Sequence, residues 1–216
     1  MSQQPVRTGF YGILDTGYVD DNEWEYKAEG LLAGGACLLQ IRAKGHPLDR
    51  ICELTERILP AVAKHAVPLI INDHLQVALE FPGTGLHLGQ EDGDIRAARE
   101  KLGPGRVLGL STHSLEQARM AIEAADILSY FAVGPVFPTG TKPAYTPVGT
   151  DLVRRVADLA PPLPFFCIGG INRLNVDEVI AAGARGIVAV SDPLQDSDTE
   201  SATRFYVERL ATPGDA

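Results

Sequence analysis

The chain has 216 residues, of which 45% are hydrophobic and 22% are charged, a composition typical of a single globular domain with a full hydrophobic core. A net charge of -9 (19 Lys and Arg against 28 Asp and Glu) disfavours nucleic-acid binding. No apolar stretch approaches the roughly 20 residues of a membrane span, and the amino terminus lacks the apolar segment of a secretory signal, so we expect a cytoplasmic protein without nucleic-acid or membrane partners.

Eight short apolar runs with high β-propensity divide the chain. Each reads as nearly continuous hydrophobic sequence, which is typical of parallel strands covered by helices. The runs occupy residues 10–15, 36–42, 68–73, 85–89, 107–112, 127–134, 164–170 and 186–191.

Helical start and stop signals lie between most of these runs. Ser114 followed by Gln117 is a capping-box pattern, Thr150 is placed to open a further helix, and Asn175 opens another that Gly183 can close. Strands that alternate with helices eight times predict an α/β fold, a single (β/α)₈ TIM barrel over residues 1–216, with a lead-in near 1–8 and a tail near 212–216. A doubly wound open sheet is the alternative.

Basic residues gather where the predicted strands end. Gln40, Arg42 and Lys44 alternate at the end of the second run, so their side chains can share one face and meet an anion. A solvated Arg and Lys at the start of a loop is the alternative. After the sixth run, a Gly-containing loop offers the hydroxyls of Thr139 and Thr141 and the ammonium of Lys142, donors suited to phosphate.

Two aspartates follow neighbouring runs. Asn72 and Asp73 end the third run, and Asp92 follows the fourth. Mg²⁺ takes oxygen ligands and commonly binds through one or two carboxylates together with substrate phosphates. A turn Asp that binds its own backbone is the alternative for either residue. Because the pair lies next to a basic cluster, we expect a Mg²⁺ site that holds a phosphorylated ligand.

The remaining strand ends are less decisive. His87 interrupts an apolar run, where it can be either a core residue or a catalytic one. Ser111 can either cap a turn or contact a ligand. Gly170 ends the seventh run, and Val190 and Ser191 end the eighth. In barrels the loops after these two strands often bind phosphate through backbone N–H groups, although two tight turns would look the same.

One metal and two phosphate pockets suggest a transfer reaction with a diphosphate leaving group. The motifs of nucleotide-binding loops, of HExxH metalloproteases and of GxSxG hydrolases are absent. The chain resembles the thiamine-phosphate synthase family, also called thiamine-phosphate pyrophosphorylase, over nearly its whole length. The segments that carry the resemblance are QIRAK at 40–44, IND at 71–73, HLGQED at 87–92, GLSTH at 109–113, GPVFPTGTK at 134–142, IGGI at 168–171 and VS at 190–191.

The resemblance implies a TIM barrel that joins 4-amino-5-hydroxymethyl-2-methylpyrimidine diphosphate to 4-methyl-5-(2-phosphoethyl)thiazole, giving thiamine phosphate and diphosphate. It assigns Mg²⁺ to Asp73 and Asp92. It assigns the pyrimidine diphosphate to Gln40, Arg42, Lys44, Asn72, Ser111 and Lys142, the pyrimidine pocket to His87, and the thiazole phosphate to Thr139, Gly140, Thr141, Gly170, Val190 and Ser191. Ile41 and Ala43 are further expected substrate-binding residues. Arg42, Lys44, Ser111 and Lys142 would assist catalysis in a dissociative mechanism.

The chain departs from the family pattern at two places. Ala43 stands where a Glu is usual, which removes an expected partner of the neighbouring cations, and Asp192 with Pro193 follows Ser191 where small or apolar residues are usual. The rival hypotheses are a thiazole tautomerase on a sister barrel and a non-catalytic paralogue that binds thiamine phosphate. We expect small phosphorylated molecules as partners, and nothing in the sequence requires or forbids a homodimer.

Overall fold

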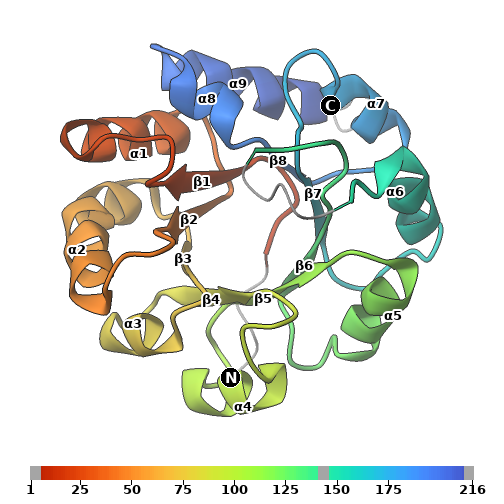
Figure 1. Cartoon of the computed structure of the whole chain (residues 1–216), viewed down its shortest axis with the longest axis horizontal. Helices are drawn as coiled ribbons and strands as arrows, with labels where there is room; N and C mark the ends of the chain where they lie inside the picture. The colour runs from red at the N-terminus through yellow and green to blue at the C-terminus, as the bar shows by residue number, and fades with distance from the viewer. Residues whose placement is uncertain (1–5, 141–145, 212–216) are drawn as a thin grey trace.

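Eight parallel strands form a closed ring in the computed structural model, which describes residues 6–140 and 146–211 (Figure 1). The strands pair in the order of the chain, and a parallel bridge between Phe10 and Ile187 joins the last to the first. Their bounds are β1 Tyr11–Asp15, β2 Leu38–Arg42, β3 Leu69–Asn72, β4 Gly85–Leu88, β5 Leu108–Thr112, β6 Tyr130–Val133, β7 Phe165–Ile168 and β8 Ile187–Val188. The (β/α)₈ barrel is therefore confirmed, and the open sheet is excluded.

Helices cover the outside of this ring (Figure 1). They are η1 Asp21–Glu23, α1 Trp24–Ala33, α2 Leu48–His65, α3 Leu75–Glu80, α4 Ile95–Leu102, α5 Leu115–Glu123, α6 Gly149–Ala157, α7 Val176–Ala181, α8 Ser191–Gln195 and α9 Thr199–Leu210. No helix in the described part of the chain is both long and apolar enough to cross a membrane.

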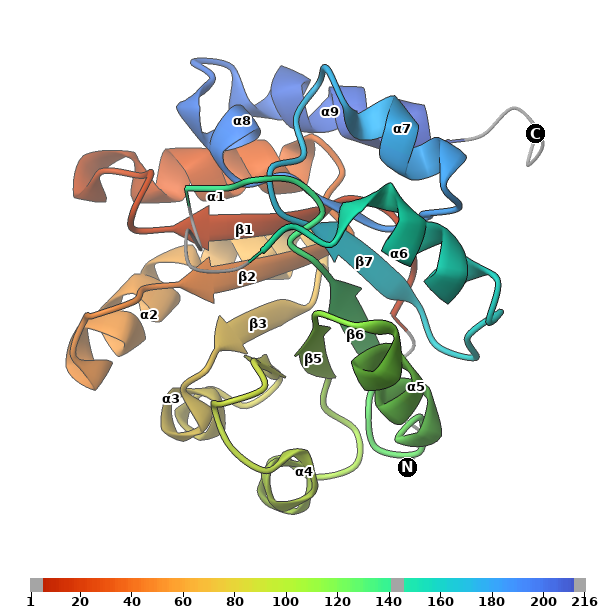
Figure 2. The same ribbon diagram turned by 45° about the vertical axis from the view of Figure 1, so that its right-hand side comes forward.

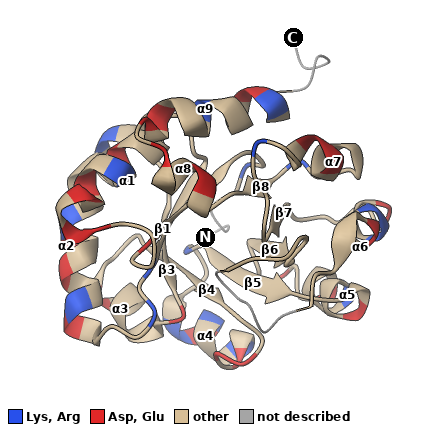
Figure 3. Cartoon of the chain, turned by 45° about the horizontal axis from the view of Figure 1, so that its top comes forward, with Lys and Arg blue, Asp and Glu red and all other residues tan. Residues whose placement is uncertain are grey.

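The strands bury both of their faces, which explains their continuous hydrophobic sequence. Outward-facing residues such as Leu39 and Phe131 pack with the helices in the larger apolar core. Inward-facing residues such as Ile13, Ile70 and Phe166 form a smaller core inside the barrel. Charged residues lie mainly on the outer helices (Figure 3).

The predicted helix starts are partly right. Ser114 caps α5 by accepting from the Gln117 N–H at 3.1 Å, as predicted. Thr150 is not a cap, because it lies inside α6, which begins at Gly149. Carbonyls of the loop after β6 accept hydrogen bonds from the N–H groups of Val148 and Gly149. The eighth run is shorter than predicted, since the backbone at its end turns helical and Ser191 begins α8.

The α7 start is a further correction. Asn175 occupies the cap position, but its side chain does not cap the helix. Its Oδ1 accepts from the Asn172 N–H at 2.8 Å and its Nδ2 donates to the Gly170 carbonyl at 2.9 Å. Asn175 therefore braces the loop after β7. Gly183 follows this helix with φ of 102°, which is consistent with the predicted closing residue.

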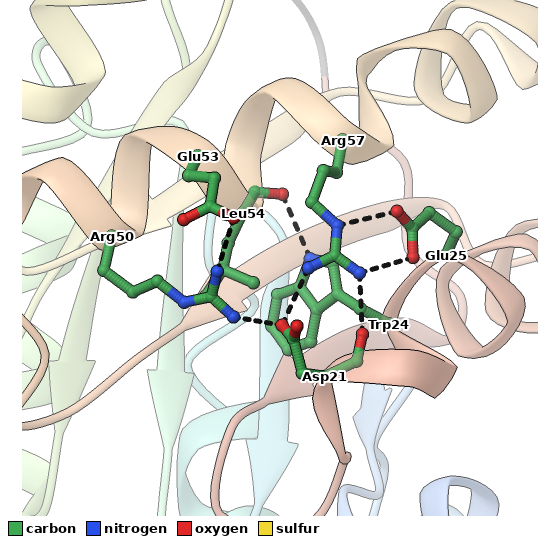
Figure 4. Close-up of polar contacts among 7 residues, drawn as sticks. All are labelled: Asp21, Trp24, Glu25, Arg50, Glu53, Leu54 and Arg57. Atoms are coloured by element: carbon green, nitrogen blue, oxygen red, sulfur yellow. Dashed lines mark hydrogen bonds and ion pairs between the residues drawn. The ribbon is translucent and has the colours of Figure 1, made fainter.

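Charged residues clamp α1 to α2 on the outer surface (Figure 4). Arg57 of α2 donates to both carboxylate oxygens of Glu25, at 2.6 and 2.7 Å, and to the Asp21 carboxylate at 2.7 Å. Beneath this clamp, the indole of Trp24 donates to the Leu54 carbonyl at 3.0 Å. The start of α1, which follows the loop after β1, is thus fixed against its neighbour.

The loops after the strands gather at one end of the barrel. The segment after β6 runs across this end toward β1, as Figures 1 and 2 both show. A Cβ atom at Gly140 in this segment would lie 3.8 Å from the Tyr18 hydroxyl in the loop after β1. The segment after β6 therefore comes close to the loop after β1 at this end of the barrel.

Candidate active site

A pocket opens at the carboxyl ends of the strands. Its volume is about 890 Å³, counting the open mouth. Nine of the residues predicted from sequence line it: Gln40, Arg42, Asn72, His87, Ser111, Thr139, Gly170, Val190 and Ser191. The barrel thus brings to one cavity residues that are far apart along the chain.

Other predicted residues lie outside this lining. Ile41 and Ala43 are buried in the outer core against the helices, so any contact with a ligand would come from their backbone. Gly140 follows Thr139 in the segment after β6 but does not line the pocket. Thr141 and Lys142 lie outside the described residues, so their predicted roles have no structural test.

A chain of hydrogen bonds crosses the buried floor of the pocket. Gln40 Nε2 donates to the Tyr11 hydroxyl at 2.6 Å, and this hydroxyl lies 2.8 Å from that of Tyr130. The Tyr130 hydroxyl lies 2.9 Å from His87 Nδ1, and His87 Nε2 lies 2.9 Å from Ser111 Oγ. Each of these side chains is buried. Both ring nitrogens of His87 are therefore engaged in the barrel interior.

The two tyrosines in this chain of hydrogen bonds, Tyr11 and Tyr130, were not predicted as site residues. Burial raises the pKa of the Tyr11 and Tyr130 phenols, so both stay neutral. Room for the Tyr130 ring comes from Gly109, where a Cβ atom would lie 2.2 Å from the ring. The only signal in the sequence was a hydroxyl inside each of two apolar strands, and a packed core tyrosine gives the same signal.

The two basic residues at the end of β2 each contact a carboxylate at the end of a neighbouring strand. Arg42 Nη1 donates to the Asp15 carboxylate at 2.6 Å. The Lys44 ammonium forms an ion pair with Asp73, while 49% of its side chain stays exposed. Arg42 lines the pocket, and Lys44 follows it by two residues without belonging to the lining. An anionic ligand in the pocket can therefore reach Arg42 directly.

Asp73 and Asp92 lie close enough to affect each other. Burial raises the pKa of the Asp73 carboxyl, the nearby Asp92 carboxylate raises it further, and Lys44 opposes both effects. Asp73 adopts a left-handed backbone with φ of 64°, and its N–H donates to the His87 carbonyl at 2.9 Å. Asp92 accepts from the Gly89 N–H at 2.8 Å. The fold therefore brings the side chains of Asp73 and Asp92 close together.

Glycine shapes the opposite side of the pocket. Gly170, after β7, has φ of 66°, and a Cβ atom there would lie 2.5 Å from the Pro138 carbonyl oxygen and 2.8 Å from Phe137 Cβ. The Phe137 N–H also donates to the Gly169 carbonyl at 2.9 Å. Only glycine permits this contact, which joins the loops after β6 and β7.

Asp192 turns away from the pocket. Its carboxylate accepts from the Tyr206 hydroxyl at 2.7 Å and lies 3.1 Å from Arg173 Nε in an ion pair. Arg173 belongs to the loop after β7 and also donates to Asp196 at 2.8 Å. Pro193 is buried in α8. The departures at 192 and 193 therefore leave the lining intact, and Asp192 ties the loop after β7 to α8.

Comparisons with known proteins agree with this geometry. The model of the thiamine monophosphate synthase family matches residues 10–192. The thiamine-phosphate synthase of Mycobacterium ulcerans (strain Agy99) is 41% identical over 194 residues, which cover 85% of this chain and 87% of the relative. The chain belongs to the thiamine monophosphate synthase family. The resemblance predicted from its motifs is confirmed, and the chain is an enzyme of thiamine phosphate formation.

Further relatives support the family and the fold. The thiamine-phosphate synthase of Acidothermus cellulolyticus is 38% identical over 183 residues, with 85% of this chain and 86% of that protein covered. A solved thiamine phosphate pyrophosphorylase from Pyrococcus furiosus superposes with a TM-score of 0.82 at 28% identity, covering 94% of this chain and 97% of that one. The barrel is thus shared with a member of the thiamine monophosphate synthase family.

The acid pair fits the Mg²⁺ expected for a thiamine monophosphate synthase. Asp73 Oδ2 is buried and accepts no hydrogen bond of normal geometry, although Lys44 lies against it. A cation between Asp73 and Asp92 would offset the repulsion by which Asp92 raises the pKa of the Asp73 carboxyl. No group of three or more metal-ligating side chains occurs among the described residues. The ion would therefore take further oxygens from water and a phosphorylated ligand, as Mg²⁺ commonly does.

Proposed function

We propose that the protein joins 4-amino-5-hydroxymethyl-2-methylpyrimidine diphosphate to 4-methyl-5-(2-phosphoethyl)thiazole with Mg²⁺, releasing diphosphate. The observation that carries this proposal is the arrangement around one pocket. Arg42, Lys44 and the acid pair lie on one side, and the glycine-containing loops after β6 and β7 lie on the other. Such a pocket offers separate places for a diphosphate and for a phosphate.

The reaction breaks the bond between the pyrimidine methylene carbon and the diphosphate oxygen, and the electron pair leaves with diphosphate. The ring amino group stabilises the resulting cation, and the thiazole nitrogen then forms the new C–N bond. Arg42 and Lys44 stabilise the negative charge that develops on the leaving group. When bound, Mg²⁺ supplies further neutralisation of this charge. The mechanism needs no side-chain nucleophile, so positioning and electrostatics suffice.

The buried floor suits the pyrimidine, and the glycine side suits the thiazole phosphate. Gln40, His87 and Ser111 belong to the hydrogen-bonded floor, and Asn72 also lines the pocket. On the opposite side we assign the thiazole phosphate to Thr139, Gly140, Gly170, Val190 and Ser191. Roles for Thr141 with the thiazole phosphate and for Lys142 with diphosphate remain predictions, as do a cytoplasmic location and a homodimer.

Product formation tests the proposal. The protein is mixed with both substrates and Mg²⁺, and thiamine phosphate and diphosphate are measured by chromatography. We expect equal amounts of the two products, loss of activity with excess EDTA, and recovery when Mg²⁺ is restored. A tautomerase would consume only a thiazole precursor, and a non-catalytic paralogue would bind thiamine phosphate without forming it. Absence of product with Mg²⁺ present rejects the proposed reaction.

The same assay tests the assignment of Asp92 to the metal site. Asp92→Asn keeps an oxygen that can accept from the Gly89 N–H but removes the carboxylate charge. The Mg²⁺ concentration for half-maximal activity should rise roughly tenfold, the size of about 1.4 kcal/mol of lost binding. Unchanged Mg²⁺ dependence would remove Asp92 from the metal site.

A further inference from the structure

Asp15, at the end of β1, is a buried carboxylate with both oxygens occupied. Its side chain is 2% exposed. Oδ1 accepts from the Gly17 N–H at 2.9 Å, and Oδ2 accepts from Arg42 Nη1 at 2.6 Å. Asp15 itself does not line the pocket, whereas Arg42 does. The carboxylate thus lies behind the guanidinium instead of facing a ligand.

The pairing of strands fixes this contact. Asp15 and Arg42 are register partners on β1 and β2, and the Thr16 N–H donates to the Arg42 carbonyl at 3.1 Å. No acid precedes Lys44 at position 43, where Ala43 packs into the outer core. The carboxylates for the two cations therefore come from flanking strands, with Asp15 of β1 serving Arg42 and Asp73 after β3 serving Lys44.

We propose that Asp15 is a positioning residue that orients Arg42 for the diphosphate of the pyrimidine substrate, an inference that rests on the proposed function. A guanidinium is planar and rigid, so holding Nη1 fixes the directions of its other N–H groups. A side chain that is already held loses less conformational freedom when the anion binds. Asp15 thereby strengthens diphosphate binding without touching the diphosphate.

A purely structural role for Asp15 makes a different prediction. Through Gly17, and through its carbonyl, which accepts from the N–H groups of Tyr18 and Val19, Asp15 also shapes the loop after β1. Loss of that shape would harm the protein whether or not Arg42 is present. An effect that acts through the guanidinium would vanish once the guanidinium is removed.

Asp15→Asn separates the two roles. The Asn carbonyl can still accept from the Gly17 N–H, while its NH₂ group cannot accept from Arg42. Asp15→Asn, Arg42→Ala and the double variant form a double-mutant cycle. Calorimetry measures binding of inorganic diphosphate with Mg²⁺, and steady-state kinetics give kcat and both KM values. If Asp15→Asn fails to fold, which circular dichroism reports, the smaller neutral variant Asp15→Ser replaces it.

We expect Asp15→Asn to weaken diphosphate binding and to raise KM for the pyrimidine diphosphate roughly tenfold, a typical size for the loss of one charge-assisted hydrogen bond. KM for the thiazole phosphate should change less than about twofold, within the small effects expected away from the contact. In the Arg42→Ala background, Asp15→Asn should add nothing. An equal loss in both backgrounds, an equal rise in both KM values, or no binding of diphosphate to the wild type would overturn the proposal.

The measurement of diphosphate binding tests this inference separately from the proposed function. If the wild type binds diphosphate with the expected coupling but forms no thiamine phosphate, the proposed reaction fails and the positioning role of Asp15 stands as a property of the anion site. If product forms but the cycle shows no coupling, only the role of Asp15 falls.

Discussion

At the scale of single residues, the floor of the pocket depends on hydroxyl groups inside the barrel. The Tyr130 hydroxyl lies within hydrogen-bond distance of both Tyr11 and His87. Buried polar groups that lose a partner cost more than the net value of the bond, because water cannot replace it. Tyr130 thus connects His87 to Tyr11 and, through Tyr11, to Gln40.

Replacing this hydroxyl should destabilise the whole protein. Tyr130→Phe keeps the ring but leaves the Tyr11 hydroxyl and His87 Nδ1 without their shared partner, so the free energy of unfolding should fall by about 1–3 kcal/mol. Tyr26→Phe is the matched control, because Tyr26 is 58% exposed and its hydroxyl donates to the Ser197 carbonyl at 3.1 Å. That change should stay within about 0.5 kcal/mol. Urea unfolding measures both, and equal losses would contradict a special role for the buried hydroxyl.

Residue identity and spacing predicted much of the pocket lining but not its supporting contacts. Arg42 and Ser111 could be found because a polar residue at the end of an apolar run is unusual. Asp15 also ends such a run, but its partner depends on which strand lies beside β1. Tyr130 lies inside an apolar run, as a core residue would. Its hydroxyl has partners on two other strands, and local spacing does not show which strands those are.

At the scale of elements, the loops after β6 and β7 support each other. The contact of Gly170 with Phe137 and Pro138 leaves no room for a side chain. Local signals did not reveal this dependence, for the same reason that they misplaced the start of α6. At α6 the loop after β6 folds back so that its own carbonyls bind the first N–H groups of the helix, and at Gly170 two loops touch, so contacts beyond the local sequence override local propensity.

Gly170→Ala should therefore disturb more than its own backbone. Gly149→Ala is the matched control, since Gly149 begins α6 with φ of 71° and has open space around a Cβ atom. Both variants should lose about 1 kcal/mol from the left-handed backbone. Only Gly170→Ala must also displace the loop after β6, so KM for the thiazole phosphate should rise several-fold in this variant alone. Equal KM values in the two variants, measured by steady-state kinetics, would show that the loop contact does not shape the phosphate side.

At the scale of the whole molecule, the order of runs along the chain was enough to predict the barrel, but not how the ring and its shell are held together. The Phe10–Ile187 bridge joins residues from the two ends of the described chain. On the outside, α2 contributes Arg57, whose partners lie in η1 and α1 (Figure 4). Long-range pairings of this kind depend on the closed topology, which no short segment encodes.

The clamp makes the stability of the molecule depend on pH. The Arg57 guanidinium lowers the pKa of the Asp21 and Glu25 carboxyls below their ordinary values. A carboxyl whose pKa is lower in the folded state stabilises the fold above the pKa of the unfolded chain, and this contribution disappears as the pH falls through the folded-state pKa. The contribution of the clamp should therefore be complete at pH 7 and decline in acid.

Arg57→Ala tests this dependence on the whole protein. Because the clamp is a network around a forked guanidinium but is open to solvent, we expect Tm to fall by roughly 2 °C at pH 7, with the difference from wild type shrinking below about pH 4. Arg154→Ala is the control, since Arg154 forms an exposed ion pair with Asp151 on α6. Its Tm should stay closer to that of the wild type at every pH. Scanning the fluorescence of Trp24, the one tryptophan and a neighbour of the clamp, together with circular dichroism, follows both variants. A Tm deficit in Arg57→Ala that is the same at pH 7 and in acid would show that the side chain stabilises through packing and not through its charge.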